Sequence, residues 1–252
     1  MSVIDELNEL ARARAAELPD CSGARSNRAN FRDAVRGRDR VHIVPEFKRA
    51  SPSQGLLSEG ADPVEQARLY EAGGASAMSI LTEPTRFLGS YEDFERVAAA
   101  TSLPLIQKDF IVDERQIAHA AHLGASAVLL IVRSLDDARL REFASYALDR
   151  DLTPLIECHD AAELDRARAL DSSLGGCVLG VNARDLSNLS IDRKACLELC
   201  REVSEEHVLL AESGMLEPAD LRATLGIADG CLVGTALMQS PDPVAFLRDS
   251  LA

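Results

Sequence analysis

The chain has 252 residues, and its 27 Lys and Arg against 41 Asp and Glu give a formal net charge of −14. Hydrophobic residues make up 46% of it, so it can bury a core and is not a disordered chain. The negative charge argues against nucleic-acid binding through a basic face. No apolar run approaches the roughly 18 residues of a membrane-spanning helix. Asp5 and Glu6 stand where a secretion signal would be basic, so we expect a cytoplasmic protein.

Only three of the basic residues are lysines, namely Lys48, Lys108 and Lys194. Few lysines beside many carboxylates indicate a surface adapted to molar salt, because at about 1 M salt the Debye length is only ~3 Å and carboxylate repulsion is screened. We therefore expect a halophilic protein, with an ordinary acidic protein as the alternative. On either interpretation, the position of each of the three remaining lysines needs a specific reason.

The six cysteines form no CxxC pair and no Cys/His cluster, which is typical of reduced thiols in a cytoplasmic protein. His119 and His122 lie three positions apart on an expected helix, but no third ligand accompanies them. We therefore predict no metal site.

Short runs of strand-forming residues alternate with amphipathic stretches along the whole chain. The predicted strands are, in chain order, Val41–Lys48, Ala75–Leu81, Leu105–Lys108, Ala127–Val132, Leu155–Glu157, Val178–Asn182, Val208–Glu212 and Cys231–Gly234. The predicted helices between them include Pro63–Ala72, Tyr91–Ala100, Glu114–Leu123, Leu135–Leu148, Ala161–Leu170 and Arg193–Glu202.

The strand pattern predicts an α/β fold. A run such as Ala127–Val132 is apolar on both faces, as in parallel strands covered by helices. Eight strands alternating with helices in 252 residues predict a single-domain (β/α)8 TIM barrel. A doubly wound sheet is the alternative, but Ser51–Gly55 after the first strand is not its GxGxxG turn. Apolar residues between Val3 and Leu18 share one helical face, so residues 1–40 are expected to be a helical extension over one end of the barrel.

Charged residues gather at the carboxyl ends of the predicted strands, where a barrel of this kind has its active site. They include two of the three lysines and three glutamates: Glu46, Lys48, Lys108, Glu157 and Glu212. Buried strand ends are costly for ions unless the charges are paired or used. We interpret the set as one cluster in a cavity, with pKa values suited to proton transfer. A salt-bridge network that closes the barrel is the alternative.

The ends of the last two strands offer small residues, hydroxyls and backbone N–H groups at Ser213-Gly214 and Gly234-Thr235. In a barrel this is the usual place for a phosphate group. Ser51 and Ser53, after the first strand, could close the ring around it. Ordinary turn chemistry is the alternative explanation for these residues.

Together these residues resemble the indole-3-glycerol phosphate synthase family of tryptophan biosynthesis. The resemblance extends from about Ile43 to the C-terminus and rests on the motifs Pro45–Ser53, Leu81–Glu83 with Phe87–Ser90, Lys108–Phe110, Leu155–Glu157, Gly180–Leu186 and Ala211–Gly214. The sequence departs from the family at Gln54, where a basic residue is common, and at Ala183, where Asn is frequent. Thr235 replaces a common Ser or Glu and keeps a hydroxyl.

The resemblance implies an enzyme that closes the indole ring of 1-(2-carboxyphenylamino)-1-deoxyribulose 5-phosphate, releasing CO2 and water without a cofactor. It implies that Lys108 is the general acid, that Glu157 is the base and that Lys48 binds the carboxylate of the substrate. Glu46 and Glu212 would orient and tune these catalytic groups. It assigns substrate binding to Asn182, Arg184, Phe110, Phe87 and Leu186. It assigns the phosphate to Ser51, Ser213, Gly214, Gly234 and Thr235. The binding partner that the resemblance implies is a small phosphorylated substrate. Whether the protein also contacts other enzymes of the pathway stays an open question.

Three other functions stay open beside this one. A Schiff-base aldolase would also place a lysine at a strand end, but its lysine forms a covalent imine. A phosphoribosylanthranilate isomerase would share the barrel and the phosphate site but would act through Cys and Asp. A non-catalytic phosphate-binding barrel would bind ligand without turnover.

Overall fold

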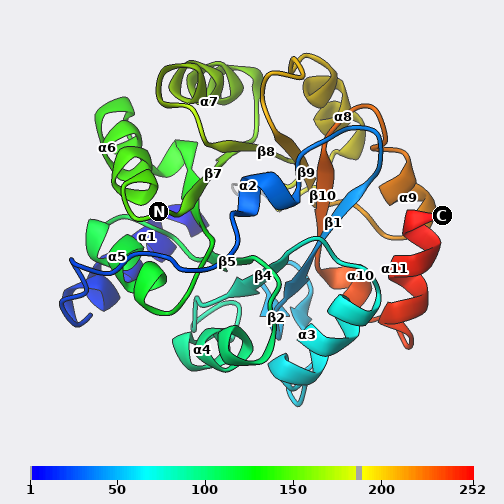
Figure 1. The fold of residues 1–252 in the computed structure, drawn as a ribbon, viewed down its shortest axis with the longest axis horizontal. Helices are drawn as coiled ribbons and strands as arrows, with labels where there is room; N and C mark the ends of the chain where they lie inside the picture. The colour runs from blue at the N-terminus through cyan, green and yellow to red at the C-terminus, as the bar shows by residue number, and fades with distance from the viewer. Residues whose placement is uncertain (1, 186–188) are drawn as a thin grey trace.

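A computed structural model describes residues 2–185 and 189–252. Within them, eight parallel strands close into a barrel in the order β1-β10-β9-β8-β7-β6-β5-β4 (Figure 1). The barrel strands are β1 (His42–Phe47), β4 (Met78–Leu81), β5 (Leu105–Lys108), β6 (Ala127–Ile131), β7 (Thr153–Cys158), β8 (Val178–Asn182), β9 (Leu209–Glu212) and β10 (Gly230–Val233). This confirms the predicted (β/α)8 barrel and excludes the doubly wound sheet, which is open.

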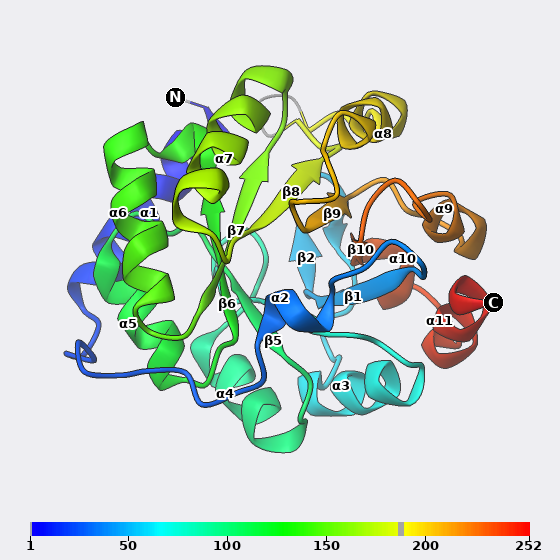
Figure 2. The ribbon, with the colours of Figure 1, turned by 45° about the horizontal axis from the view of Figure 1, so that its top comes forward.

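Helices form a ring outside the strands, as Figure 2 shows. They are α3 (Pro63–Ala72), α4 (Tyr91–Ala100), α5 (Glu114–His122), α6 (Asp137–Leu148), α7 (Ala161–Leu174), α8 (Arg193–Arg201), α9 (Pro218–Arg222), α10 (Thr235–Met238) and α11 (Pro243–Leu251). Two short elements interrupt the alternation, the hairpin β2 (Ala50–Ser51) with β3 (Gly55–Leu56) and the 3-10 turn η1 (Val132–Ser134).

The unbroken apolar run of β6 has a direct structural reason. All five of its residues are buried. Ala127, Leu129 and Ile131 belong to the cluster inside the barrel, whereas Val128 and Leu130 belong to the layer between strands and helices. Strand side chains alternate between the two faces, so both faces of such a strand must be apolar.

Many of the acidic residues begin helices. Asp side chains accept backbone N–H groups at the first turns of six described helices, at Asp62, Asp113, Asp136, Asp160, Asp192 and Asp242. An N-cap carboxylate satisfies donors that the helix leaves free and lies at the positive end of the helix dipole. Part of the negative charge is therefore structural.

The expected N-terminal helix over one end of the barrel is present as α1, and the rest of the extension reaches the other end as well. Helix α1 (Val3–Ala16) contacts η1 and sends Arg14 to Asp109 just after β5, with 2.7 Å between Nη2 and Oδ1. The chain then crosses to the other end. There α2 (Phe31–Ala34) sends Arg32 Nε to the Cys177 carbonyl, just before β8, at 3.1 Å.

Candidate active site

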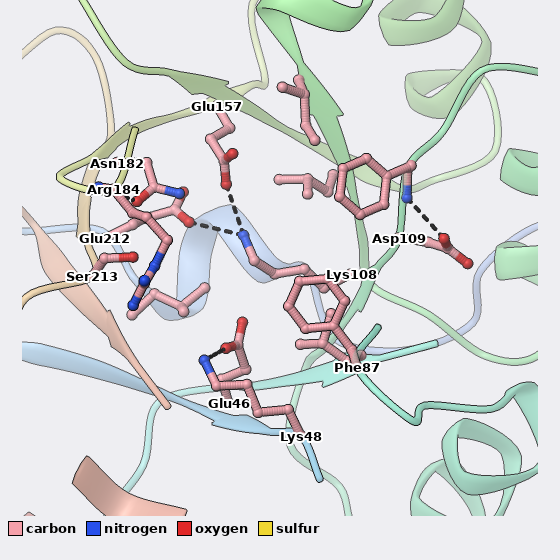
Figure 3. Close-up of a pocket in the computed structure, with 15 residues that line it drawn as sticks. Glu46, Lys48, Phe87, Lys108, Asp109, Glu157, Asn182, Arg184, Glu212 and Ser213 are labelled. Atoms are coloured by element: carbon pink, nitrogen blue, oxygen red, sulfur yellow. Dashed lines mark hydrogen bonds and ion pairs between the residues drawn. The ribbon is translucent and has the colours of Figure 1, made fainter. Parts of the chain in front are cut away.

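The carboxyl ends of five strands bring the predicted charged residues into one cavity (Figure 3). Alternate residues of a strand point inward, so the inward position nearest each strand end faces the same space. The polar lining of the cavity comes from β1, β5, β7, β8 and β9 and from the segments that follow them, and its apolar lining comes largely from β4, β6 and β10. Its charged and polar lining residues are Glu46, Lys48, Lys108, Asp109, Glu157, Asn182, Arg184, Glu212 and Ser213.

Lys108 is the centre of the site. Its Nζ lies 2.8 Å from Glu157 Oε2 and 2.9 Å from Glu212 Oε2 (Figure 3). The lysine side chain is 12% exposed, and the two glutamates are 3% and 1% exposed. An ammonium group has three N–H donors. Two of them are engaged by the glutamates, which leaves a third for a molecule in the cavity.

Lys48 forms a second ion pair across the cavity, with its Nζ 2.6 Å from Glu46 Oε1. Gly234, after β10, lies directly beneath this pair. A Cβ at position 234 would lie 2.7 Å from Glu46 Oε1 and 2.8 Å from Lys48 Nζ. Glycine is therefore required there for the pair to keep its position.

The protonation states of the central cluster are set by burial and by mutual charge. Burial lowers the pKa of Lys108, but the charges of Glu157 and Glu212 outweigh that effect and raise it, so the lysine is protonated. Burial opposes ionisation of Glu157, yet Lys108 and His159 hold its pKa well below the usual range. Burial, together with the charge of Glu157, raises the pKa of Glu212 to about 8. Two neighbouring carboxyl groups with pKa values pushed apart are typical of acid–base sites.

Asn182 and Arg184 stand over this cluster (Figure 3). The Asn182 side-chain carbonyl accepts the Arg184 backbone N–H at 2.9 Å, and Arg184 Nη1 donates to Ser53 Oγ at 2.6 Å. Burial lowers the pKa of Arg184, although a guanidinium remains charged. The bond to Ser53 links β8 to the segment after β1 and closes the rim of the cavity.

One side of the cavity is apolar. The rings of Phe87 and Phe110 lie 6.4 Å apart between centroids, at 37°. Leu81, Leu129, Ile131 and Leu232 continue this lining. An aromatic ring of a ligand could pack here while its polar groups face the lysines.

Four of the five predicted phosphate residues line one adjoining pocket: Ser213, Gly214, Gly234 and Thr235. Ser51 lines a neighbouring pocket instead, and its hydroxyl accepts the Gln54 N–H at 3.2 Å. Ser213 and Gly214 have φ values of 64° and 76°, a turn that aims successive backbone groups differently from a strand. The predicted contact residue Leu186 lies outside the described residues.

The sequence analysis missed a row of charged side chains that contacts Glu157 from the side away from Lys108. His159 lies between Glu157 and Glu163, and Glu163 in turn contacts Arg133. The signal was the position of His159, two residues after Glu157 at a strand end. Asp109 was missed as well, although it follows Lys108 directly; it is 1% exposed and pairs with Arg14 of α1.

No group of three or more His, Cys, Asp or Glu side chains in residues 2–185 and 189–252 is arranged to hold a metal ion. Over the same residues, none of the helices is both long enough and apolar enough to cross a membrane. The cavity lining itself offers ammonium, guanidinium, carboxylate, amide and hydroxyl groups.

Solved structures confirm the fold. Thiamine phosphate pyrophosphorylase from Pyrococcus furiosus superposes with a TM-score of 0.61, covering 88% of this chain and 96% of its own, at 17% identity. At that identity the likeness concerns the barrel alone. Barrel and strand-end site together define a (β/α)8-barrel enzyme.

The family follows from the sequence relatives. The family model for indole-3-glycerol phosphate synthase matches residues 4–250. The indole-3-glycerol phosphate synthase of Leifsonia xyli is 46% identical over 86% of this chain and 82% of its own length. That of Streptomyces griseus is 40% identical over 100% of this chain and 96% of its own. The chain belongs to the indole-3-glycerol phosphate synthase family and is a carboxy-lyase of that family.

Proposed function

We propose that this chain converts 1-(2-carboxyphenylamino)-1-deoxyribulose 5-phosphate to indole-3-glycerol phosphate with the residues of the central cluster. The observation that carries the proposal is the pairing of Lys108 with two buried glutamates at one cavity, beside an aromatic lining. The reaction requires an acid, then a base, and a site for an anionic aromatic ring. These groups supply each of them within one cavity.

Ring closure needs a general acid. The aromatic carbon that bears the carboxylate attacks the ketone carbon, and the ketone oxygen takes up a proton. Lys108 gives that proton through the N–H that its glutamate partners leave free. Lys48 binds the substrate carboxylate, and Phe87 and Phe110 pack on the aromatic ring. The carbon–carboxylate bond then breaks, and its electron pair restores the aromatic ring.

Dehydration needs a base and an acid. Glu157, held ionised by its cationic neighbours, removes a proton from the methylene carbon next to the nitrogen. The hydroxyl group formed at the former ketone carbon leaves as water after protonation by Lys48 or Lys108. Glu46 and Glu212 orient these lysines. Asn182 and Arg184 position the glycerol chain.

The phosphate site is the pocket of Ser213, Gly214, Gly234 and Thr235, with Ser51 contributing from the neighbouring pocket. In this arrangement the phosphate of the substrate binds in this pocket and its aromatic ring packs on Phe87 and Phe110. The ion pairs of Lys48 and Lys108 lie between them. A crystal structure with sulfate in this pocket would support the assignment. Sulfate bound elsewhere, with this pocket filled by side chains, would contradict it.

Two further expectations concern the environment in which the protein works. The buried cysteines suit a cytoplasmic enzyme, and the net charge of −14 suits function in salt. We expect a cytoplasmic, halophilic enzyme on these grounds, with at most transient contact with other enzymes of the pathway.

The deciding experiment incubates the purified protein with the carboxyphenylamino substrate and follows indole absorbance, with and without molar KCl. Turnover under either condition supports the proposal. Borohydride treatment with substrate separates it from a Schiff-base aldolase, because only an imine would be trapped covalently at a lysine. Binding without turnover in both buffers would overturn it.

A further inference from the structure

The two oxygens of Glu157 face different partners. Oε2 points to Lys108 in the cavity, at 2.8 Å from Nζ. Oε1 lies 3.3 Å from Nε2 of His159, on the side away from the cavity lysine. Both side chains are nearly inaccessible, at 3% and 2% exposure. Oε2 thus faces the cavity beside Lys108, while Oε1 lies at ion-pair distance from the imidazole, whose Nε2 has no hydrogen-bond partner among the described residues.

His159 is itself fixed from behind. Its Nδ1 lies 3.1 Å from Glu163 Oε2, and its backbone N–H donates to the same oxygen at 2.9 Å. The other oxygen of Glu163 accepts Arg133 Nε at 2.8 Å. Glu163 also belongs to the first turn of α7, where the Asp160 side chain accepts its N–H. The imidazole therefore stands between two carboxylates, with its ring position determined by a helix start.

Glu212 lacks this support. It shares Lys108 with Glu157, but its Oε1 has no hydrogen-bond partner among the described residues. The difference matters when Lys108 gives its proton to the ketone, because the neutral amine then no longer favours the ionised form of either buried glutamate. One of them must then take up a proton or keep another cation. Among the described residues, Glu157 has such a cation in His159, and Glu212 pairs with Lys108 alone.

We propose that His159 is a positioning residue that keeps Glu157 ionised and its Oε2 turned to the substrate, so that Glu157 and not Glu212 is the base of dehydration. The inference rests on the function proposed above. Burial lowers the pKa of His159, but its contacts with Glu157 and Glu163 outweigh burial and raise that pKa to about 9, which keeps the imidazole doubly protonated.

Other charged groups face this set and are included in the argument. Lys108 of β5 and Glu212 of β9 face Glu157 from across the barrel. Asp160 and Asp185 contact Arg133, at 3.8 Å and 3.3 Å. The Cys158 thiol lies between Glu157 and His159 in the chain but donates to the Gly180 carbonyl, and burial raises its pKa. Of these groups, only Lys108 and His159 put a positive charge on Glu157 directly.

The test compares His159→Gln with His207→Gln in the full-length enzyme. His207 is the matched control, because it is buried and its Nδ1 lies 2.7 Å from Asp171 Oδ2, yet it precedes β9 at the opposite end of the barrel. A single turnover is followed with two readouts, CO2 release and indole formation, and kcat is measured against pH. Without the imidazolium charge the Glu157 pKa must rise, so the acid limb of kcat moves to higher pH.

For His159→Gln we expect that limb to move by roughly one to three pH units, the range by which a neighbouring opposite charge shifts a carboxyl pKa. Indole formation should slow at least about tenfold at neutral pH, with CO2 release within about twofold and KM within about threefold. Glu163→Gln, which keeps the imidazole, should show a smaller shift in the same direction. His207→Gln should show none.

Equal slowing of CO2 release and indole formation in His159→Gln, or an unmoved acid limb in both His159→Gln and Glu163→Gln, would overturn the inference alone. A wild-type enzyme that forms no indole product would instead overturn the proposed function, and the inference with it. If His159→Gln does not fold, the Glu163→Gln profile decides the matter.

Discussion

The three lysines differ sharply in environment. Lys48 and Lys108 have side chains 12% exposed, and each is paired with glutamate inside the barrel mouth. Lys194 is 88% exposed on α8 and lies 3.8 Å from Glu198, a pair of a kind that contributes little. Because lysines are so rare in this chain, Lys48 and Lys108 could be identified from the sequence as candidate site residues.

Replacing Lys108 by Ala should remove the acid of ring closure. General acid–base catalysis contributes about 10²–10⁴-fold, equivalent to roughly 3–5 kcal/mol of barrier. We expect kcat to fall by that order or more, with substrate binding less affected. Steady-state kinetics measure this, with Lys194→Ala as the control, which should stay within about twofold.

Replacing Glu157 by Gln should stop the reaction after ring closure, because the base of dehydration is then missing. CO2 should be released while indole lags, and separate assays of the two products reveal the difference. Near-wild-type turnover in both Lys108→Ala and Glu157→Gln would falsify the mechanism. The cluster would then be a structural ion-pair network.

At the scale of the element, β8 carries a glycine that packs directly against the Glu212 side chain. A Cβ on Gly180 would lie 2.1 Å from Glu212 Oε1 and 3.2 Å from Leu155 Cδ1. Gly180→Ala should push Glu212 away from Lys108 and lower kcat at least about tenfold, while the barrel still folds. Circular dichroism and kinetics check both parts. Gly23→Ala is the control, because no heavy atom lies within 4 Å of a Cβ there.

Helix α1 is tied to the site by Arg14, which pairs with two buried carboxylates, Asp109 and, at 3.6 Å from Nη1, Glu83 Oε1. Asp109 is fully enclosed and accepts Arg14 Nη2 at 2.7 Å and the Thr82 hydroxyl at 2.8 Å. Burial raises the pKa of Asp109, and Arg14 opposes this. Removing one partner of a buried pair costs about 3–5 kcal/mol when burial is complete. Because Arg14 is 20% exposed, we expect about 2–3 kcal/mol for Arg14→Met in urea unfolding.

The double variant Arg14→Met with Asp109→Asn should recover at least half of that loss, since the Asp109 charge is then absent and the Glu83 carboxylate keeps its hydrogen bonds from Thr85, Arg86 and Phe87. Additive losses from the two substitutions would show instead that the pair itself contributes nothing. The cycle therefore separates the ion pair from the packing of α1.

For the whole molecule, the net charge of −14 predicts that salt stabilises the fold. Screening of carboxylate repulsion at about 1 M salt should raise the melting temperature relative to low salt. Thermal melts in low and molar KCl measure it. An equal or higher melting temperature at low salt would contradict the halophilic interpretation, while leaving the enzyme family unaffected. The N-cap aspartates are the part of this charge that salt should affect least, because helix N–H groups already satisfy them.

The sequence by itself determined the barrel, the order of its elements and the strand ends that carry chemistry. These follow from local patterns, since alternation along a strand decides which side chains point inward. The helices Pro63–Ala72 and Tyr91–Ala100 have the boundaries that the periodicity predicted. The motifs around Lys48 and Lys108 were sufficient to indicate the family.

The tertiary structure alone decided which charges meet. Lys108 contacts Glu157 and Glu212, which are 49 and 104 residues away in the chain, because closure of the barrel brings β5, β7 and β9 around one axis. It also revealed the support of His159 and the anchoring of α1 through Asp109, 95 residues from Arg14. Such contacts have no sequence period, because they depend on where loops and helix starts come to lie once the sheet has closed on itself.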